Sequence, residues 1–180
     1  MCGPGDDTVA RTKDRDVPAR RRTVLCTPRV PVVPALMAIS VDSDLIKRAD
    51  AVVRRSAVYT PDPVRGDRWR SFAKELVEDK NYVLRGDCDD WGQTAIHLLS
   101  MYGVPRDRLY RAIVKSPPKF SAPDHMIGLV RDDAGTLWTV GDTFGPPQKC
   151  TKTRLGPHAP YRTARVDEHL GWVLWDGSLV

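Results

Sequence analysis

The spacing of the hydrophobic residues divides the chain into two parts near residue 104. Before this point they recur about every 3.6 positions, which predicts one amphipathic helix over residues 43–53 and another within residues 85–103. The first carries on one face Leu45, Ala49, Val52 and Val53, and the second Trp91, Ala95, Leu98, Leu99 and Tyr102. A shorter helix, opened by residues 66–69, is predicted between them.

After residue 104 hydrophobic and polar residues alternate, which predicts β-strands. The expected strands cover residues 109–115, 125–131 and 136–142, with shorter ones around 151–154 and 172–175. Residues 132–135 have the composition of a hairpin turn, whereas the prolines in residues 116–123 exclude that segment from a β-ladder. Helices that precede an antiparallel sheet and pack on it give an α+β fold class.

The composition is that of a soluble globular protein with one domain. The chain has 180 residues, of which 41% are hydrophobic and 28% are charged. Residues 1–43 are rich in proline, arginine and aspartate without periodicity, so we expect a flexible or poorly ordered N-terminal segment. The folded domain is then expected over residues 44–180. No stretch approaches the ~20 apolar residues of a membrane-spanning helix, so no membrane span is expected.

Residues 20–40 resemble a signal peptide, because three arginines precede an apolar stretch that ends in small residues. Arg29 and several prolines argue against this interpretation, since they place a charge in the apolar stretch and break its helix. These residues therefore favour a cytoplasmic location.

The charges and the cysteines exclude several classes of partner and site. The net charge of +5 does not gather in a basic stripe with interleaved aromatic residues, so nucleic-acid binding is not expected. The four cysteines contain no Cys-x-x-Cys pair and no spacing typical of zinc ligands. We therefore expect free thiols rather than a metal knuckle or a disulfide framework.

Cys88 is the first candidate for chemistry. Asp87 is a favourable N-cap residue, which would place Cys88 among the unpaired amides at the positive end of the helix. A thiol in that position is favoured as the thiolate, the form that attacks carbonyl carbons. The alternative is a cysteine that packs in the core as a small hydrophobic residue.

A base and an orienting acid follow in the sheet. If the turn over residues 132–135 is symmetric, Arg131 lies opposite Thr136 and His125 opposite Asp142, where the carboxylate can accept an imidazole N–H. Taken singly, His125 could instead bond to backbone and Asp142 could be a turn residue. The remaining histidines, His97, His158 and His169, are poorer candidates, and we expect the last two at the surface.

Several blocks of sequence resemble, in the same order, the bacterial transglutaminase-like cysteine proteinases. They are Asp67–Trp69, Gly86–Trp91, Gly103–Leu109, Asp124–Ile127 and Val140–Phe144. The resemblance implies a papain-like/transglutaminase-like core with Cys88 as nucleophile, His125 as base and Asp142 as orienting acid. It also implies a protein or peptide substrate and, from members that cleave surface adhesins, a periplasmic or secreted location. Asp89 and Trp91 depart mildly from the family pattern, and Ala51 and Arg55 stand where relatives often carry asparagine.

The acids that flank the cysteine raise the question of a metal ion. Asp87, Asp89 and Asp90 place like charges beside a thiolate and would raise the pKa of Cys88 unless a cation offset them. Calcium takes hard oxygen ligands of this kind. Relatives bind calcium at the acids that flank the cysteine, which carries over to Asp87 and Asp89. The alternative is that these acids only complement the helix dipole.

Three functions follow from these features. The leading hypothesis is a cysteine endopeptidase that forms an acyl-enzyme on Cys88 and requires no cofactor for the chemistry. The second is a transglutaminase or amidase that passes the acyl group to an amine. The third is a non-catalytic, calcium-dependent binding or structural module, in which Cys88 would react with thiol reagents no faster than Cys150.

Overall fold

The protein is described here from a computed structural model that covers residues 39–62, 69–115, 125–166 and 171–180. The predictions for residues 1–38, for the proline-rich loop over 116–123, and for Cys2, Cys26 and His169 lie outside these residues. Val41 is 1% exposed, and its backbone N–H donates to Asp133 at 2.9 Å.

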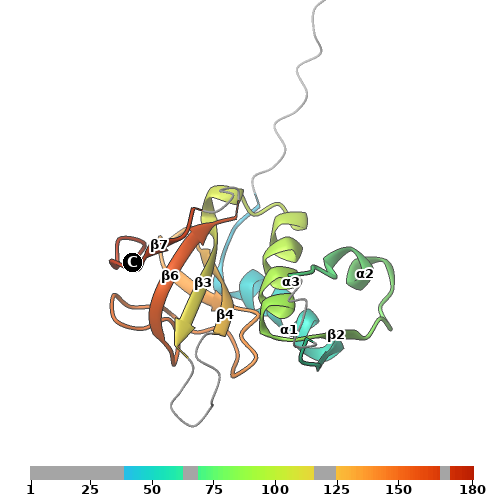
Figure 1. Ribbon diagram of the computed structural model, residues 1–180. Coiled ribbons are helices and arrows are strands. Elements are labelled where there is room, and N and C mark those ends of the chain that lie inside the picture. Colours follow the sequence, from blue (N-terminus) through green and yellow to red (C-terminus); the bar gives the residue numbers. More distant parts are fainter. Residues whose placement is uncertain (1–38, 63–68, 116–124, 167–170) are drawn as a thin grey trace, which may run out of the picture. The chain divides into compact units, whose positions relative to one another are not determined.

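Three α-helices form one side of the structure (Figure 1). Helix α1 spans Ser43–Ser56 and begins at Asp42, whose side chain accepts the backbone N–H groups of Asp44 and Leu45. Helix α2 is shorter, spanning Ala73–Glu78. Helix α3 spans Cys88–Met101. It is stopped by Gly103, two residues later, whose φ of 93° lies in the left-handed region that glycine adopts at little cost. The helices predicted over residues 43–53 and within 85–103 are confirmed.

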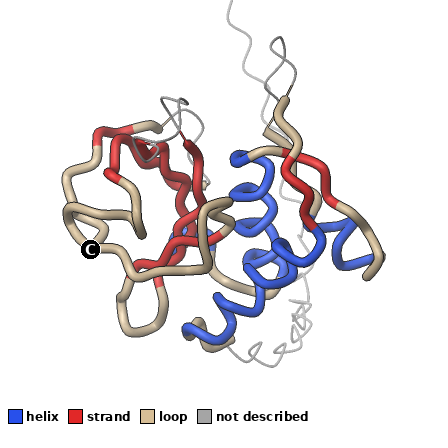
Figure 2. The backbone as a smooth tube through the Cα atoms, turned by 90° about the horizontal axis from the view of Figure 1, so that it is seen from below, coloured by secondary structure: helices blue, strands red, loops and turns tan. Residues whose placement is uncertain are grey.

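An antiparallel sheet of five strands lies beside the helices, as Figures 1 and 2 show. In chain order its strands are β3 (Leu109–Lys115), β4 (His125–Arg131), β5 (Leu137–Val140), β6 (Ala159–Arg165) and β7 (Val173–Leu174). Their order across the sheet is β5-β4-β3-β6-β7. Two short parallel strands, β1 (Ala57–Tyr59) and β2 (Leu84–Gly86), form a separate ribbon that leads into α3. A 3-10 turn over Arg106–Arg108 joins α3 to β3.

The strands over residues 109–115 and 125–131 are confirmed, and β5 and β7 lie within the strands predicted over 136–142 and 172–175. One strand prediction is wrong, and one strand was missed. Residues 151–154 form only an isolated bridge, whereas the sequence analysis did not predict β6 at all. β6 carries Pro160 and has no regular alternation, and it joins the sheet through its pairing with β3.

The register of the β4–β5 hairpin also differs from the prediction by one residue. Arg131 pairs with Leu137 instead of Thr136, because five residues rather than four form the loop. Asp132 closes this loop twice: its backbone N–H donates to the carbonyl of Thr136, and its side chain accepts the N–H of Thr136 at 2.7 Å. The pairing ends at Val140, so His125 has no direct partner on β5.

Both faces of the sheet are covered by hydrophobic residues. The face toward the helices shares a core with α1 and α3, which includes Ile46, Val53, Ile96, Leu99 and Val140. A second core, which includes Ala112, Ile127, Leu129, Cys150 and Leu155, contains side chains from β3, β4 and the segment before β6. In the described part of the chain, none of the helices has the length and apolar character needed to cross a membrane.

Helix α3 packs closely against β4 because glycines face each other at the contact. A Cβ atom at Gly92 would lie 2.8 Å from the sulfur of Met126 and 3.1 Å from the backbone nitrogen of Gly128. A Cβ atom at Gly141 would lie 2.6 Å from the carbonyl oxygen of Trp91. These contacts bring the first turn of α3 next to the start of β4 and the end of β5.

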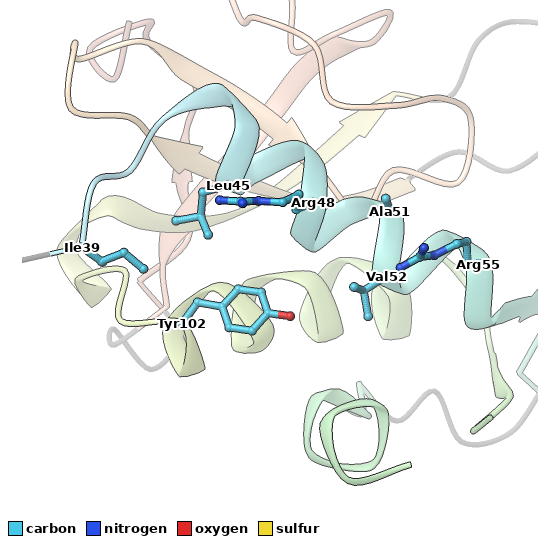
Figure 3. Close-up of a pocket in the computed structure, with 7 residues that line it drawn as sticks. All are labelled: Ile39, Leu45, Arg48, Ala51, Val52, Arg55 and Tyr102. Atoms are coloured by element: carbon cyan, nitrogen blue, oxygen red, sulfur yellow. The ribbon is translucent and has the colours of Figure 1, made fainter. Parts of the chain in front are cut away.

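An open groove of about 570 Å³ runs between α1 and the C-terminal part of α3 (Figure 3). Its lining is mostly apolar, including Leu45, Val52 and Tyr102, with Arg48 and Arg55 also at its surface. Tyr102 lies about 20 Å along α3 from Cys88, since the helix rises 1.5 Å per residue.

Candidate active site

The structure brings His125 and Asp142 together at the end of the sheet. The Nε2 atom of His125 lies 2.9 Å from Oδ1 of Asp142, and the two side chains are 4% and 1% exposed. The predicted contact therefore forms although the predicted register is wrong. It forms because Gly141, with φ of 65°, follows the last paired residue of β5 and turns the chain back toward His125.

Asp142 accepts hydrogen bonds on both carboxylate oxygens. Besides His125, Oδ1 accepts the backbone N–H of Phe144 at 3.0 Å, and Oδ2 lies 2.8 Å from Nε2 of His158. Burial raises the pKa of Asp142, but these hydrogen bonds lower it more, so that the pKa lies well below its usual range. An ionised carboxylate only accepts, so both histidines carry a proton on Nε2. This leaves Nδ1 of His125 as the basic nitrogen.

His158 corrects the expectation of a surface residue without an acid partner. It is 1% exposed, and its ring lies 5.1 Å from that of His125, with Asp142 bonded to both. It follows a tight turn closed by two backbone hydrogen bonds between Leu155 and His158. A Gly-Pro pair at residues 156–157 was the only local signal of this turn, and nothing in the sequence spacing links His158 to an acid.

A second feature missed from sequence holds the loop after β5 against α1. Asp50 is 1% exposed and accepts the backbone N–H of Gly141 at 2.8 Å. Arg54, one helical turn later, forms an ion pair with Asp50 and donates to the carbonyl oxygens of Asp142 and Gly145. Burial raises the pKa of Asp50 in spite of the Arg54 charge. The pair fixes the backbone on both sides of Asp142.

Cys88 is the first residue of α3, as the sequence predicts, and it is half-buried. Its sulfur accepts a hydrogen bond from the backbone N–H of Met126, the residue after His125. The nucleophile candidate thus lies against the first residues of β4, where the base candidate begins the strand.

The electrostatic environment of Cys88 opposes ionisation of the thiol. Burial and the charges of Asp87 and Asp89 together raise the pKa of Cys88 to about 11, although the backbone amide of Met126 acts in the opposite direction. Tyr59, at the end of β1, is 55% exposed, and it lies close enough to Cys88 and the two acids for them to influence its own pKa. The pKa of Tyr59 is raised by burial, by Cys88 and by both acids.

Asp87 and Asp89 have the arrangement needed for a hard cation. Asp87 occupies the N-cap position of α3, but its side chain caps no helix amide, and its buried Oδ1 has no hydrogen-bond partner among the described residues. One ligand atom each from Asp87, Cys88 and Asp89 lies within 4.8 Å of the others. Asp90 differs, because Arg70 binds it through a backbone N–H at 2.8 Å and a guanidinium at 2.9 Å. The acids at positions 87 and 89 therefore offer the kind of oxygen ligands that a calcium ion takes.

The aromatic ring of Phe144 lies against the buried histidine pair. The ring of Phe144 lies 4.7 Å from that of His125 and 5.6 Å from that of His158. Phe144 is itself 39% exposed. Phe144 therefore places a partly exposed aromatic ring against both imidazoles.

Comparison with solved structures finds the same fold in a protein whose sequence is only 18% identical to this one. Legionella pneumophila LapG superposes with a TM-score of 0.54 at 18% identity, covering 75% of this chain and 70% of LapG. Its calcium-bound form gives 0.53 at 18% identity, covering 73% and 67%, and its EGTA-treated form gives 0.52 at 18%, covering 73% and 66%. The chain has a papain-like/transglutaminase-like fold. No family model and no curated protein matches the sequence.

LapG is a transglutaminase-like cysteine protease, so the likeness supports a protease-like fold for this chain. The calcium-bound LapG structure shows that a protein of this fold binds calcium. At 18% identity the likeness extends to the fold and not to individual residues.

Proposed function

We propose that this protein is a cysteine endopeptidase in which Cys88 is the nucleophile, His125 the general base and Asp142 the orienting acid. The observation that carries the proposal is the buried hydrogen bond between His125 and Asp142, made by the residue before Met126, whose backbone amide contacts the half-buried thiol of Cys88. Each residue type suits its role: a thiol attacks, an imidazole moves the proton, and a carboxylate holds the imidazole tautomer.

The hydrogen-bonding pattern supports a specific path for the proton. With Nε2 of His125 donating to Asp142, the lone pair on Nδ1 is available to take the proton of Cys88. The sulfur then attacks the carbonyl carbon of the substrate, and the protonated His125 donates to the leaving amine. Water, deprotonated by the same nitrogen, releases the acyl group in the second step.

The start of α3 supplies groups for the negative oxygen that forms during attack. The backbone N–H of Cys88 belongs to the first turn, where amides have no carbonyl partner within the helix. Such amides stabilise an oxyanion, and the positive end of the helix dipole acts in the same direction.

Calcium has a defined place in this proposal. Asp87 and Asp89 would hold the ion, because Oδ1 of Asp87 is buried without a partner and both acids lie beside the sulfur. When bound, calcium supplies positive charge that offsets the two carboxylates and fixes the loop before α3. The residues of the chain carry out every bond-making and proton-transfer step themselves.

The experiment that tests the proposal is trapping of the acyl-enzyme. The protein is mixed with an activated peptide ester, quenched in acid within the first turnover, and digested for mass spectrometry. The proposal expects the acyl group on Cys88 alone, its release by water, and no acylation of Cys88→Ala. Acylation at another residue, or none, contradicts it. Release only by an added amine would instead assign the protein to acyl transfer.

A further inference from the structure

The role of His158 goes beyond the triad and rests on the proposed function. Its side chain is 0% exposed and lies 2.8 Å from Oδ2 of Asp142, the oxygen that His125 does not use. A buried histidine that binds the second oxygen of the same carboxylate has no part in moving the proton of Cys88. The question is what its hydrogen bond does for the other two residues.

The topology delivers both histidines to the same end of the sheet. β4 and β6 flank β3 on either side, and each begins beside the last residues of β3. His125 pairs with Val114, and Ala159, the residue after His158, pairs with Lys115. The two imidazoles therefore come from the starts of the two strands on either side of β3, and both bind the carboxylate of Asp142, which lies in the loop after β5.

The backbone around His158 is held in place independently of its side chain. Leu155, at the other end of the turn, is 0% exposed and belongs to the second core. Gly156 has φ of 62° and lies against Thr139 of β5, where an added Cβ would be 3.2 Å from the Thr139 methyl group. The turn is thus anchored at Leu155, Gly156 and Ala159, and His158 points from it toward Asp142.

We propose that His158 is a positioning residue: its Nε2–H holds the Asp142 carboxylate so that Oδ1 accepts the Nε2–H of His125, which leaves Nδ1 of His125 free for Cys88. Without His158, Oδ2 of Asp142 would be buried at 1% exposure with no donor. The carboxylate would then rotate or take up a proton, and in either case His125 would lose its fixed acceptor. The hydrogen bonds from both histidines also lower the pKa of Asp142, which keeps it an acceptor.

One alternative is that His158 only fills space beneath Phe144. The imidazole Nδ1 of His158 has no hydrogen-bond partner among the described residues, so the ring makes a single polar contact, through Nε2. Replacements that keep the size but differ in the donor separate the two roles. His158→Gln retains an N–H near the position of Nε2, whereas His158→Leu keeps an apolar side chain without a donor.

The test reads the tautomer of His125 directly, by ¹H–¹⁵N NMR of the imidazole nitrogens in the full-length resting protein. In the wild type we expect Nε2 of His125 to be protonated and protected from exchange. His158→Leu should speed exchange of this proton at least about tenfold, mix the two tautomers, and lower kcat about 10- to 100-fold with little change in KM. His158→Gln should keep the wild-type tautomer and most of kcat.

His97 provides the matched control, because it is a half-buried histidine on α3 whose Nε2 contacts Gln93 at 2.6 Å, away from Asp142. His97→Gln should leave the His125 resonances and turnover unchanged. The proposal is overturned if His158→Leu preserves the His125 tautomer and kcat, or if His158→Gln loses both. If His158→Leu does not fold, His158→Met, which also lacks a donor, takes its place in the comparison with His158→Gln. A wild type with the expected tautomer but no acylation of Cys88 would refute the proposed function and leave this inference intact.

Discussion

The two halves of the candidate site differ in how completely hydrogen bonds within the chain satisfy their polar groups. At the end of the sheet, His125, Asp142 and His158 are each less than 5% exposed, and both oxygens of the carboxylate accept hydrogen bonds. At the start of α3, Cys88 is half-buried between Asp87 and Asp89, and one oxygen of Asp87 has no partner among the described residues.

This difference shows which half depends on something outside the chain. The acid–base half is held by its own hydrogen bonds and by the Asp50–Arg54 pair on α1. The nucleophile half carries a thiol whose pKa is raised to about 11, first by burial and then by the two negative charges beside it. A cation at Asp87 and Asp89 would supply the missing compensation. Most of the predictions below alter one half alone, and one separates the two halves.

The largest effect is expected from removal of the sulfur. Cys88→Ala should abolish hydrolysis, and Cys88→Ser should nearly do so, with losses of at least about 10⁴-fold in kcat/KM and no change in folding. Steady-state cleavage of a peptide substrate, alongside thermal unfolding, measures both. Cys150→Ala is the control: Cys150 lies in the second core, so this variant should lose stability and keep activity. Comparable activity in Cys88→Ala would remove the nucleophile from the account.

Asp142→Asn should preserve the fold and lower kcat by about 10²- to 10⁴-fold. The asparagine amide can present an N–H to His125, which would favour the wrong imidazole tautomer. Single-turnover kinetics separates this loss from a change in binding. A drop of less than about tenfold would indicate that another group orients His125.

Gly141→Ala should damage both halves by separating them. Its φ is 65°, and the added methyl group would lie 2.6 Å from the Trp91 carbonyl, so α3 must move from the loop that carries Asp142. We expect roughly 2 kcal/mol or more of lost stability and about 100-fold lower kcat.

Gly135→Ala is the matched control for Gly141→Ala. Its φ of 81° carries the same backbone strain, but no atom lies within 4 Å of the added methyl group. We expect Gly135→Ala to lose about 1 kcal/mol of stability and to keep its full activity. Equal effects of the two variants on kcat would show that the close approach of α3 does not matter for the site.

Calcium should act on the nucleophile half alone. Chelation should lower turnover, and added calcium should restore it and raise Tm, because the ion binds only the folded state. Magnesium should substitute poorly, since it requires a tighter octahedral shell. Calorimetry on wild type and on Asp87→Asn/Asp89→Asn measures the binding. Absence of heat and of any Tm shift in the wild type would leave these acids as residues that only complement the helix dipole.

The smallest effect concerns the stability of the acid–base half at low pH. The pKa of Asp142 is lower in the folded than in the unfolded protein, so its contribution is present above about pH 4 and is lost as the pH falls below that value. Asp142→Asn should therefore flatten the stability profile below pH 4, by up to about 1.4 kcal/mol per pH unit. Denaturant unfolding at several pH values measures the two slopes, and parallel slopes would contradict the assignment.

The sequence predicted what depends on local pattern. The helix that begins at Cys88 has a strong apolar stripe and a glycine stop, β3 alternates between buried and less buried residues, and β4 is a short apolar run, so their positions were correct. The contact between His125 and Asp142 followed from their place near the ends of a hairpin. The prediction of this contact survived a register error of one residue, because His125 and Asp142 both lie beyond the Gly128–Val140 pair, where the pairing of β4 with β5 ends.

What the sequence did not predict depends on long-range contacts. Asp50 reaches Gly141 across 91 positions, and His158 reaches Asp142 through a turn that precedes an irregular strand. Neither contact leaves a periodic signal, because a single buried polar residue within an apolar or mixed segment resembles an ordinary surface residue. β6 was missed for a related reason: most of its residues are not fully buried, and its pairing with β3 rather than its composition makes it a strand.

The central claim is that the acid–base half activates the thiol of Cys88, and the rates of alkylation at the two described cysteines test it most directly. The protein is treated with iodoacetamide at neutral pH, and the modified peptides are followed by mass spectrometry in wild type and in His125→Ala. We predict that Cys88 reacts at least about tenfold faster than Cys150 in the wild type, and that His125→Ala removes most of this advantage. Exposure alone would favour Cys88 in both proteins. Equal rates in the wild type, or an advantage that His125→Ala leaves unchanged, would contradict the claim.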